Sequence, residues 1–228
     1  MSDYEKQNNV KSSNQVSRYV LFEGKEGGNP KIMFVGNSIT RHAPKPEIGW
    51  LSDCGMAASK LENDYVHLVM ASVLEKYPEA SFCIVQAAQW ERSYRDFDFD
   101  EYFSSAKSFK PDVIICTISE NIPEDAFEKE VFSRKLYELH TYLKGGNENC
   151  AFIEGSNFFS SSKKDEGIKL YAEKYGAHYV DLSDLIRDDI NLAKGLFEHK
   201  GIQIHPGDKG MRTIADRYIE KLRCILSI

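Results

Sequence analysis

Residues 31–36, KIMFVG, form an uninterrupted apolar run that ends at the polar pair Asn37-Ser38. A run of this kind, without the alternation of a half-exposed strand, is typical of a strand buried on both faces of a parallel sheet. Four similar runs follow along the chain: SFCIVQ at 81–86, PDVIICTI at 111–118, CAFIEG at 150–155 and HYVDL at 178–182. The sequence therefore predicts about five buried parallel strands.

Segments with helical apolar spacing separate these strands. Asp64 is suited to begin one helix, Gly176 to end another and Asp208 to begin the last, and a further helix is expected over 124–143. The connections are too long for hairpins, so we expect parallel strands with helices on both faces of the sheet. The predicted fold class is a single-domain α/β protein, a three-layer α/β/α sandwich around a central parallel sheet.

The chain is expected to comprise a polar N-terminal arm, residues 1–29, and one domain, residues 30–228. Within the arm, RYVLFE at 18–23 has the composition of a short strand. The sequence contains no internal repeat or low-complexity segment, and a length of 228 residues suits one α/β core.

Composition excludes several classes of partner. The formal net charge is −6, from 29 Lys and Arg against 35 Asp and Glu, so nucleic acid is not expected as a partner. No apolar run reaches the roughly 18 residues that suggest a membrane span, and the N-terminus lacks the apolar core of a secretory signal. We therefore expect a cytoplasmic location away from membranes. The five cysteines are odd in number and scattered, which favours reduced thiols over disulfides or a zinc site.

The first strand leads into Gly36-Asn37-Ser38-Ile39-Thr40. A serine at a strand-to-helix turn exposes its hydroxyl above the carboxyl edge of the sheet, where ligands of such sheets bind. Its backbone N–H, at the start of a helix, is suited to face an oxyanion. A serine at this position is also a common helix cap. The segment FVGNSIT, however, resembles the first block of the SGNH/GDSL hydrolase family, whose serine is the nucleophile.

A second resemblance lies near the C-terminus, in Ile204-His205-Pro206-Gly207-Asp208. It is similar to the last block of the same family, whose histidine is the general base. The two blocks occur in the family's order, and the resemblance covers about residues 30 to 226. It implies a flavodoxin-like SGNH hydrolase fold with Ser38 and His205 as catalytic residues. The family chemistry needs no cofactor, and the sequence has no HExxH, CxxC or phosphate-loop motif, so no metal is expected.

The oxyanion hole is expected to combine the Ser38 N–H with the side chain of Asn121. Asn121 stands in Ser119-Glu120-Asn121, after the third strand, where the family has GxN. The structural alternative for Asn121 is a turn residue. The family also supplies a glycine N–H after the second strand, but this chain has no glycine in residues 86–92. Any non-proline residue can supply a backbone N–H, so the residue that provides this further donor is left open.

A larger departure concerns the residue that orients His205. The family has an Asp three residues before the histidine, and this chain has Ile202 there. We expect a backbone carbonyl to orient the imidazole, giving a Ser-His dyad. The alternative is a carboxylate from another loop, with Glu91 first, then Glu120 or Glu198. Either group would hold the tautomer that accepts the serine proton, although a carbonyl stabilises the imidazolium less.

Substrate choice is predicted from the loops beside the nucleophile. The expected pocket residues are Asn37, His42, Trp50 and Trp90, although core packing is an equal alternative for a tryptophan. Polar and aromatic loops favour a small or carbohydrate ester, with an acetyl group as the acyl part. The alternatives are a lipase- or thioesterase-like enzyme of the same fold and a non-catalytic carbohydrate-binding protein. The expected partner is thus a small-molecule or carbohydrate ester, and the sequence leaves the oligomeric state open.

Overall fold

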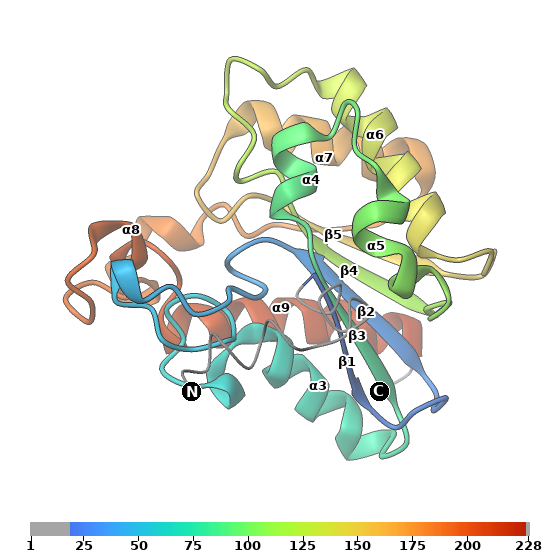
Figure 1. The fold of residues 1–228 in the computed structure, drawn as a ribbon, viewed down its shortest axis with the longest axis horizontal. Helices are drawn as coiled ribbons and strands as arrows, with labels where there is room; N and C mark the ends of the chain where they lie inside the picture. The colour runs from blue at the N-terminus through green and yellow to red at the C-terminus, as the bar shows by residue number, and fades with distance from the viewer. Residues whose placement is uncertain (1–18, 227–228) are drawn as a thin grey trace, which may run out of the picture.

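A computed structural model describes residues 19–226 of the chain, so most of the predicted N-terminal arm lies outside the described residues. One mixed sheet of six strands runs through the molecule in the order β1-β3-β2-β4-β5-β6 (Figure 1). The strands are β1 (Val20–Gly24), β2 (Lys31–Gly36), β3 (Ser81–Gln86), β4 (Val113–Thr117), β5 (Ala151–Gly155) and β6 (His178–Val180). The five predicted apolar runs are β2 to β6, which pair in parallel.

The sixth strand is β1, which pairs antiparallel with β3 from Val20 to Gly24. It comes from the RYVLFE segment and closes one edge of the sheet. This strand therefore belongs to the sheet, although it falls in the segment 1–29 that was assigned to an N-terminal arm. The parallel part of the sheet has the flavodoxin-like strand order, in which the chain starts in the middle and builds outward in both directions.

The strand order decides where a site can form. Strand β2 lies between β3 and β4, so the chain leaves β2 at the point where the strand order reverses. Gly36, the last residue of β2, pairs with Gln86 on one side and Thr117 on the other. The loops after these three strands therefore start side by side at the carboxyl edge, where ligands bind in sheets of this type.

Helices cover both faces of the sheet, as predicted (Figure 1). The layer below the sheet in the view holds α3 (Tyr65–Lys76) and α9 (Asp208–Leu226), and the layer above it holds α5 (Phe99–Lys107), α6 (Lys129–Leu143) and α7 (Ser162–Tyr175). Side chains alternate along β2: Ile32 and Phe34 pack into one core cluster, and Met33 and Val35 into the other. Both clusters are apolar, which explains why the strand reads as a continuous apolar run.

Several helix ends follow the sequence signals. The Asp64 side chain accepts a hydrogen bond from the His67 N–H and caps α3, and Gly176 ends α7 in the left-handed conformation at φ 73°. Helix α6 begins at Lys129 instead of 124, because a turn closed by the Ala126 N–H and the Pro123 carbonyl precedes it. The remaining helical segments are short: η2 (Pro46–Ile48), η3 (Leu61–Asn63), α4 (Ala88–Ser93), η4 (Leu185–Arg187), η5 (Asp189–Asn191) and α8 (Lys200–Gln203).

The structure also bears on the cysteines and on membrane-spanning helices within residues 19–226. All five cysteines lie in this range and are free thiols; four of them are buried, and Cys224 is exposed. No helix in the described range is long and apolar enough to cross a membrane.

His67 links α3 to the edge strand β1. Its Nδ1 lies 2.7 Å from Asp64 Oδ1, and its Nε2 lies 3.4 Å from Glu23 Oε1. Burial opposes a charge on the imidazole, but the hydrogen bonds to Asp64 and Glu23 outweigh burial and raise the pKa of His67 to about 9. The folded state therefore holds a proton on His67 that the unfolded chain releases at lower pH.

Replacing His67 with Gln is expected to remove a pH-dependent part of the stability. A raised histidine pKa stabilises the fold fully below about pH 6.5, and the stabilisation is lost as the pH rises through 9. The free energy of unfolding of H67Q should thus fall below that of the wild type by on the order of 2 kcal/mol at pH 6. The difference should shrink towards pH 10 in urea titrations at each pH. A difference that stays constant over this range would contradict the assigned ion pairs.

Candidate active site

Ser38 lies two residues after the end of β2, in a tight turn. The N–H groups of Thr40 and Arg41 donate to the Asn37 carbonyl over 3.1 and 3.0 Å, and the chain then enters a loop instead of a helix. The predicted helix start at this position is therefore wrong: the first α-helix after β2 begins at Tyr65. The Ser38 N–H belongs to a hydrogen-bonded turn and is not part of a helix terminus.

The structure brings Ser38 and His205 together from opposite ends of the chain. Ser38 Oγ lies 2.9 Å from His205 Nε2, and His205 Nδ1 lies 2.7 Å from the Gly201 carbonyl oxygen. A carbonyl only accepts hydrogen bonds, so the Nδ1 atom must carry the hydrogen in this contact. The Nε2 lone pair of the neutral ring then faces the serine hydroxyl.

The short helix α8 explains how a carbonyl comes to hold His205. Gly201 lies in α8 and His205 follows its end, with the His205 N–H bonded to the Ile202 carbonyl over 2.9 Å. The Ile202 side chain, at the position where the resembled family has Asp, is fully buried in the core on the α3 and α9 side of the sheet. Ile202 thus packs in the core, and the Gly201 backbone carbonyl orients the imidazole ring of His205.

His205 is neutral at physiological pH. Burial lowers its pKa to about 4, against a smaller opposing effect of the Gly201 hydrogen bond, and the nearby His42 lowers it slightly further. A neutral imidazole with its free lone pair towards a hydroxyl is the protonation state that a general base requires.

Glu91 does not contact His205. It lies on α4, is 1% exposed, and its Oε1 accepts hydrogen bonds from Asn37 Nδ2 at 3.0 Å and from the Ser119 N–H at 2.6 Å. Its Oε2 accepts a hydrogen bond from Asn121 Nδ2. Burial raises the pKa of Glu91, and the hydrogen bonds from these donors oppose the increase. Glu91 thus joins the loops after β2 and β4 and does not orient the imidazole.

The other carboxylates proposed for His205 also lie elsewhere. Glu120 accepts hydrogen bonds from the N–H groups of Phe158 at 2.6 Å and Phe159 at 3.4 Å. Burial and the charge of Glu91 raise the pKa of Glu120 to about 8, so this residue supports the loop after β5. Glu198 is exposed to solvent.

Asn121 and Ser38 line the same cavity. Asn121 Nδ2 donates one hydrogen to Glu91, and an amide nitrogen has a second hydrogen to offer. Ser119, two residues before Asn121, adopts φ 97°, a backbone conformation that favours glycine, and the resembled family has Gly at this position. Buried hydrogen bonds hold Ser119 in this conformation, from its N–H to Glu91 and between its Oγ and Asn157.

A cavity of about 480 Å³ opens over these groups. A smaller hollow of about 370 Å³, beside α3 and α9, contains none of the predicted site residues. The large cavity is lined by Tyr19, Ser38, Arg41, His42, Ala43, Met56, Gln86, Ala88, Gln89, Arg92, Asn121 and His205.

Of the four residues predicted to form the substrate pocket, only His42 lines this cavity. Trp50 is 2% exposed and packs against Phe197, with its Nε1 bonded to the His42 carbonyl. Trp90 is fully buried on the inner face of α4, and Asn37 is fully buried against Glu91. The tryptophan prediction is corrected to core packing, because large aromatic side chains fill the space behind the loops instead of facing the solvent. The sequence reasoning missed Arg41, Gln86, Gln89 and Arg92, although all four follow or end a strand at the carboxyl edge.

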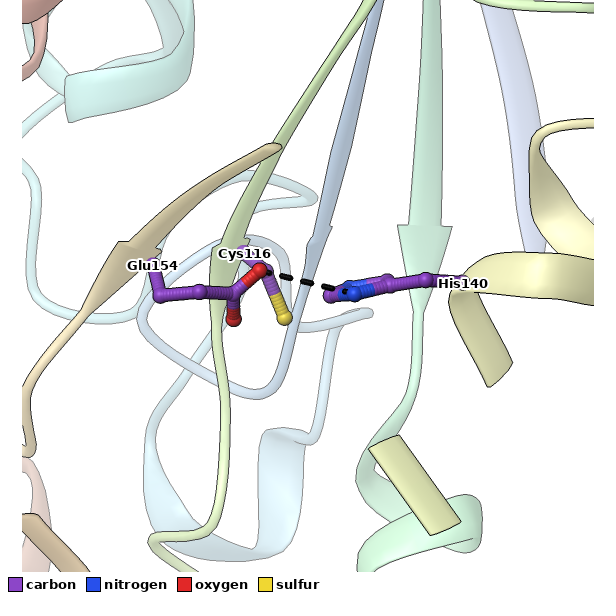
Figure 2. Close-up of side chains that lie close together, drawn as sticks. All are labelled: Cys116, His140 and Glu154. Atoms are coloured by element: carbon purple, nitrogen blue, oxygen red, sulfur yellow. Dashed lines mark ion pairs between the residues drawn. The ribbon is translucent and has the colours of Figure 1, made fainter. Parts of the chain in front are cut away.

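One group of metal-ligating side chains occurs among the described residues, away from this cavity. Cys116 from β4, His140 from α6 and Glu154 from β5 point towards one another in the core, with their ligand atoms within 4.8 Å (Figure 2). Burial raises the pKa of Glu154 to about 8, lowers that of His140 to about 3, and raises that of Cys116. The donor types suit zinc, but all three groups are uncharged near neutral pH, so binding a cation would require the release of protons.

Comparisons with known proteins relate this geometry to a fold. No family model matches the sequence, and no curated protein matches it. Solved structures do match. A two-domain esterase active on acetylated mannans, co-crystallised with mannopentaose, aligns at TM-score 0.54 and 18% identity over 96% of this chain and 53% of its own. This chain therefore spans about half the length of that esterase.

Two further structures align along their whole length or nearly so. The psychrotrophic esterase EstA from Pseudoalteromonas sp., in a structure inhibited by monoethylphosphonate, aligns at TM-score 0.57 and 13% identity over 88% of this chain and 100% of its own. A protein described as a GDSL-like lipase from Parabacteroides merdae aligns at TM-score 0.55 and 16% identity over 87% and 96%. At these identities the comparison shows the fold, and it confirms the predicted fold class.

Proposed function

We propose that this protein is a serine esterase of the SGNH type that hydrolyses small acyl esters, with Ser38 as the nucleophile and His205 as the general base. The observation that carries the proposal is the 2.9 Å contact between Ser38 Oγ and His205 Nε2, with the opposite ring nitrogen held by the Gly201 carbonyl. This arrangement supplies a nucleophile, a base and a group that orients the base, which are the parts that acyl transfer requires.

In the first half of the reaction, Ser38 Oγ attacks the ester carbonyl carbon as His205 Nε2 takes the hydroxyl proton. The carbonyl π electrons move onto oxygen, which gives a tetrahedral oxyanion. His205 then donates the proton to the alcohol oxygen as the C–O bond breaks, and an acyl-Ser38 ester remains. In the second half, His205 takes a proton from water, the hydroxide attacks the acyl carbon, and Ser38 leaves with the proton restored.

The oxyanion is stabilised by the Ser38 N–H and by the second amide hydrogen of Asn121. Each such donor is worth about 3 kcal/mol of transition-state stabilisation where it is held in place before the charge develops. Glu91 supplies that placement as a positioning residue, since its carboxylate fixes the Asn121 amide from behind.

The proposed substrate is an acetyl ester of a small alcohol or a carbohydrate. The fold is shared with an esterase active on acetylated mannans, which supports this class. The cavity supports it independently, because glutamine, asparagine, arginine and tyrosine side chains line it and suit a hydroxylated molecule better than a long acyl chain. A lipase- or thioesterase-like activity on long chains is therefore disfavoured.

A second candidate function is a carbohydrate-binding protein without catalytic activity. It is favoured by one observation: within residues 19–226, His205 Nδ1 bonds to a carbonyl and not to a carboxylate. A carbonyl stabilises the imidazolium of the transition state less than a carboxylate does.

Hydrolysis of p-nitrophenyl acetate by wild type and by S38A separates the two candidate functions. The esterase proposal expects at least a hundredfold loss of turnover in S38A, because the nucleophile is removed, and it expects labelling of the wild type by a serine-directed phosphonate. A folded wild type that neither turns over esters nor takes the label, but binds glycans equally well as S38A, would instead identify a binding protein.

The pH dependence of kcat/KM is expected to reveal the lowered pKa of His205. A neutral imidazole is needed for proton abstraction, so kcat/KM should rise with pH through about 4 and stay level from about pH 5 to 8. Subtracting the rate with S38A removes background hydrolysis, and circular dichroism establishes that the fold persists at each pH. An inflection near 6.5, the value of a solvent-exposed histidine, would contradict the buried dyad.

Glu91→Gln is expected to lower kcat about tenfold with little change in KM. Both oxygens of the Glu91 carboxylate accept hydrogen bonds from N–H groups, and the NH₂ group of a glutamine would replace one acceptor with a donor that faces another donor. Asn121→Ala should lower kcat about a hundredfold, because it removes a donor to the oxyanion. If Glu91 acts by positioning Asn121, the effect of E91Q should largely disappear in the N121A background. Full additivity in the double variant, or wild-type turnover in E91Q, would remove this role from Glu91.

A further inference from the structure

We propose that the cavity selects esters whose alcohol part carries a carboxylate, and that Arg92 binds this carboxylate. Acetylated sugar acids are the chemical class that meets this description. The inference rests on the proposed esterase function and adds the specificity of the same site.

Helix α4 places Arg92 in the cavity wall. Ala88, Gln89 and Arg92 line the cavity, whereas the intervening Trp90 and Glu91 are buried in the protein interior. Positions 88, 89 and 92 fall on one side of a helix because the repeat is 3.6 residues. Arg92 thus shares a short helix with the buried Glu91, which bonds to Asn121 in the loop after β4.

Arg92 has no partner of its own. Within residues 19–226 it forms no hydrogen bond or ion pair, in contrast to the other arginines nearby. Arg41 makes a two-point contact with Asp53, with both distances 2.8 Å, and Arg95 lies 2.7 Å from Glu128. An unpaired guanidinium in an acidic protein of net charge −6, at the mouth of the proposed active site, is available to an anionic ligand.

The charge of the cavity points the same way. Arg41 and Arg92 are among its lining residues and no Asp or Glu is, but Asp53 offsets the charge of Arg41, so Arg92 is the lining cation whose charge is left for a ligand. Burial lowers the pKa of His42, the Ala43 hydrogen bond and the charge of Asp53 oppose this, and the charges of Lys45 and Arg92 lower it further, so the charge of Arg92 acts on a residue that lines the cavity. A ligand with a negative charge is favoured in such a field, and it also meets no like charge on the walls.

The neighbouring groups define the rest of the ligand. A guanidinium presents a planar fork that matches a carboxylate with two parallel hydrogen bonds. Gln89 offers an amide donor and acceptor that suit sugar hydroxyls. The Gln86 amide is held by the Arg41 carbonyl and the Ala88 N–H, and it keeps one hydrogen and one lone pair for a ligand. The cavity volume of about 480 Å³ exceeds what an acetyl group occupies and accommodates a sugar ring as well.

The experiment compares two esters that differ only in charge: an O-acetylated methyl galacturonoside with a free carboxylate, and the same compound as its carboxylate methyl ester. Acetate release by wild type, R92Q and R95Q gives kcat/KM for each. Arg95 is the matched control, because it lies three residues further along, after the end of α4, and is paired with Glu128 outside the cavity.

The wild type is expected to prefer the free acid by about tenfold or more, the effect of one charge-assisted pair. R92Q should abolish this preference mainly through KM, and R95Q should retain it. Raising the ionic strength should weaken the preference of the wild type, since a partly exposed ion pair is screened. Equal use of both esters by the wild type, or a preference that survives in R92Q, overturns the inference.

Failure of this inference is distinguishable from failure of the proposed function. An enzyme that cleaves p-nitrophenyl acetate and both sugar esters without discrimination is an esterase whose Arg92 does not select charge. A wild type that is inactive on all three and takes no phosphonate label refutes the esterase function itself, and with it the inference.

Discussion

The site depends on one buried carboxylate. Glu91 is 1% exposed and accepts hydrogen bonds from Asn37, from the Ser119 backbone and from Asn121. These donors come from the loops after β2 and β4, and Glu91 itself follows β3, so one side chain joins all three loops at the carboxyl edge. Burying a carboxylate is costly unless donors surround it, and here the donors are the residues whose positions the proposed chemistry needs.

The imidazole is held by a different means. The buried Ile202 anchors α8 in the core, and the Gly201 carbonyl reaches His205 Nδ1 at 2.7 Å. A carbonyl fixes the tautomer as firmly as a carboxylate, but it brings no full negative charge. Burial without that charge lowers the pKa of His205 to about 4, so the ring is neutral at physiological pH.

The six-residue helix α4 has one side buried in the protein and another side that lines the cavity. Its inner side carries Trp90 and Glu91, and its outer side carries Gln89 and Arg92. The inner side is fixed by core packing and hydrogen bonds, so the outer side has a rigid base from which to contact a ligand. This arrangement explains how a short helix both positions the Asn121 amide of the proposed oxyanion hole and lines the cavity.

The strands can be predicted from the sequence alone, because a continuous apolar run such as KIMFVG reflects burial on both faces of the sheet, and this information is local. The sequence also singled out Ser38 and His205 through short motifs. The contacts of Glu91, Trp50 and Trp90 and the place of Arg92 in the cavity wall follow from the tertiary structure. The surroundings of such a side chain depend on how loops from separate strands converge, and a repeat of 3.6 residues places neighbours such as Glu91 and Arg92 about 100° apart around one helix.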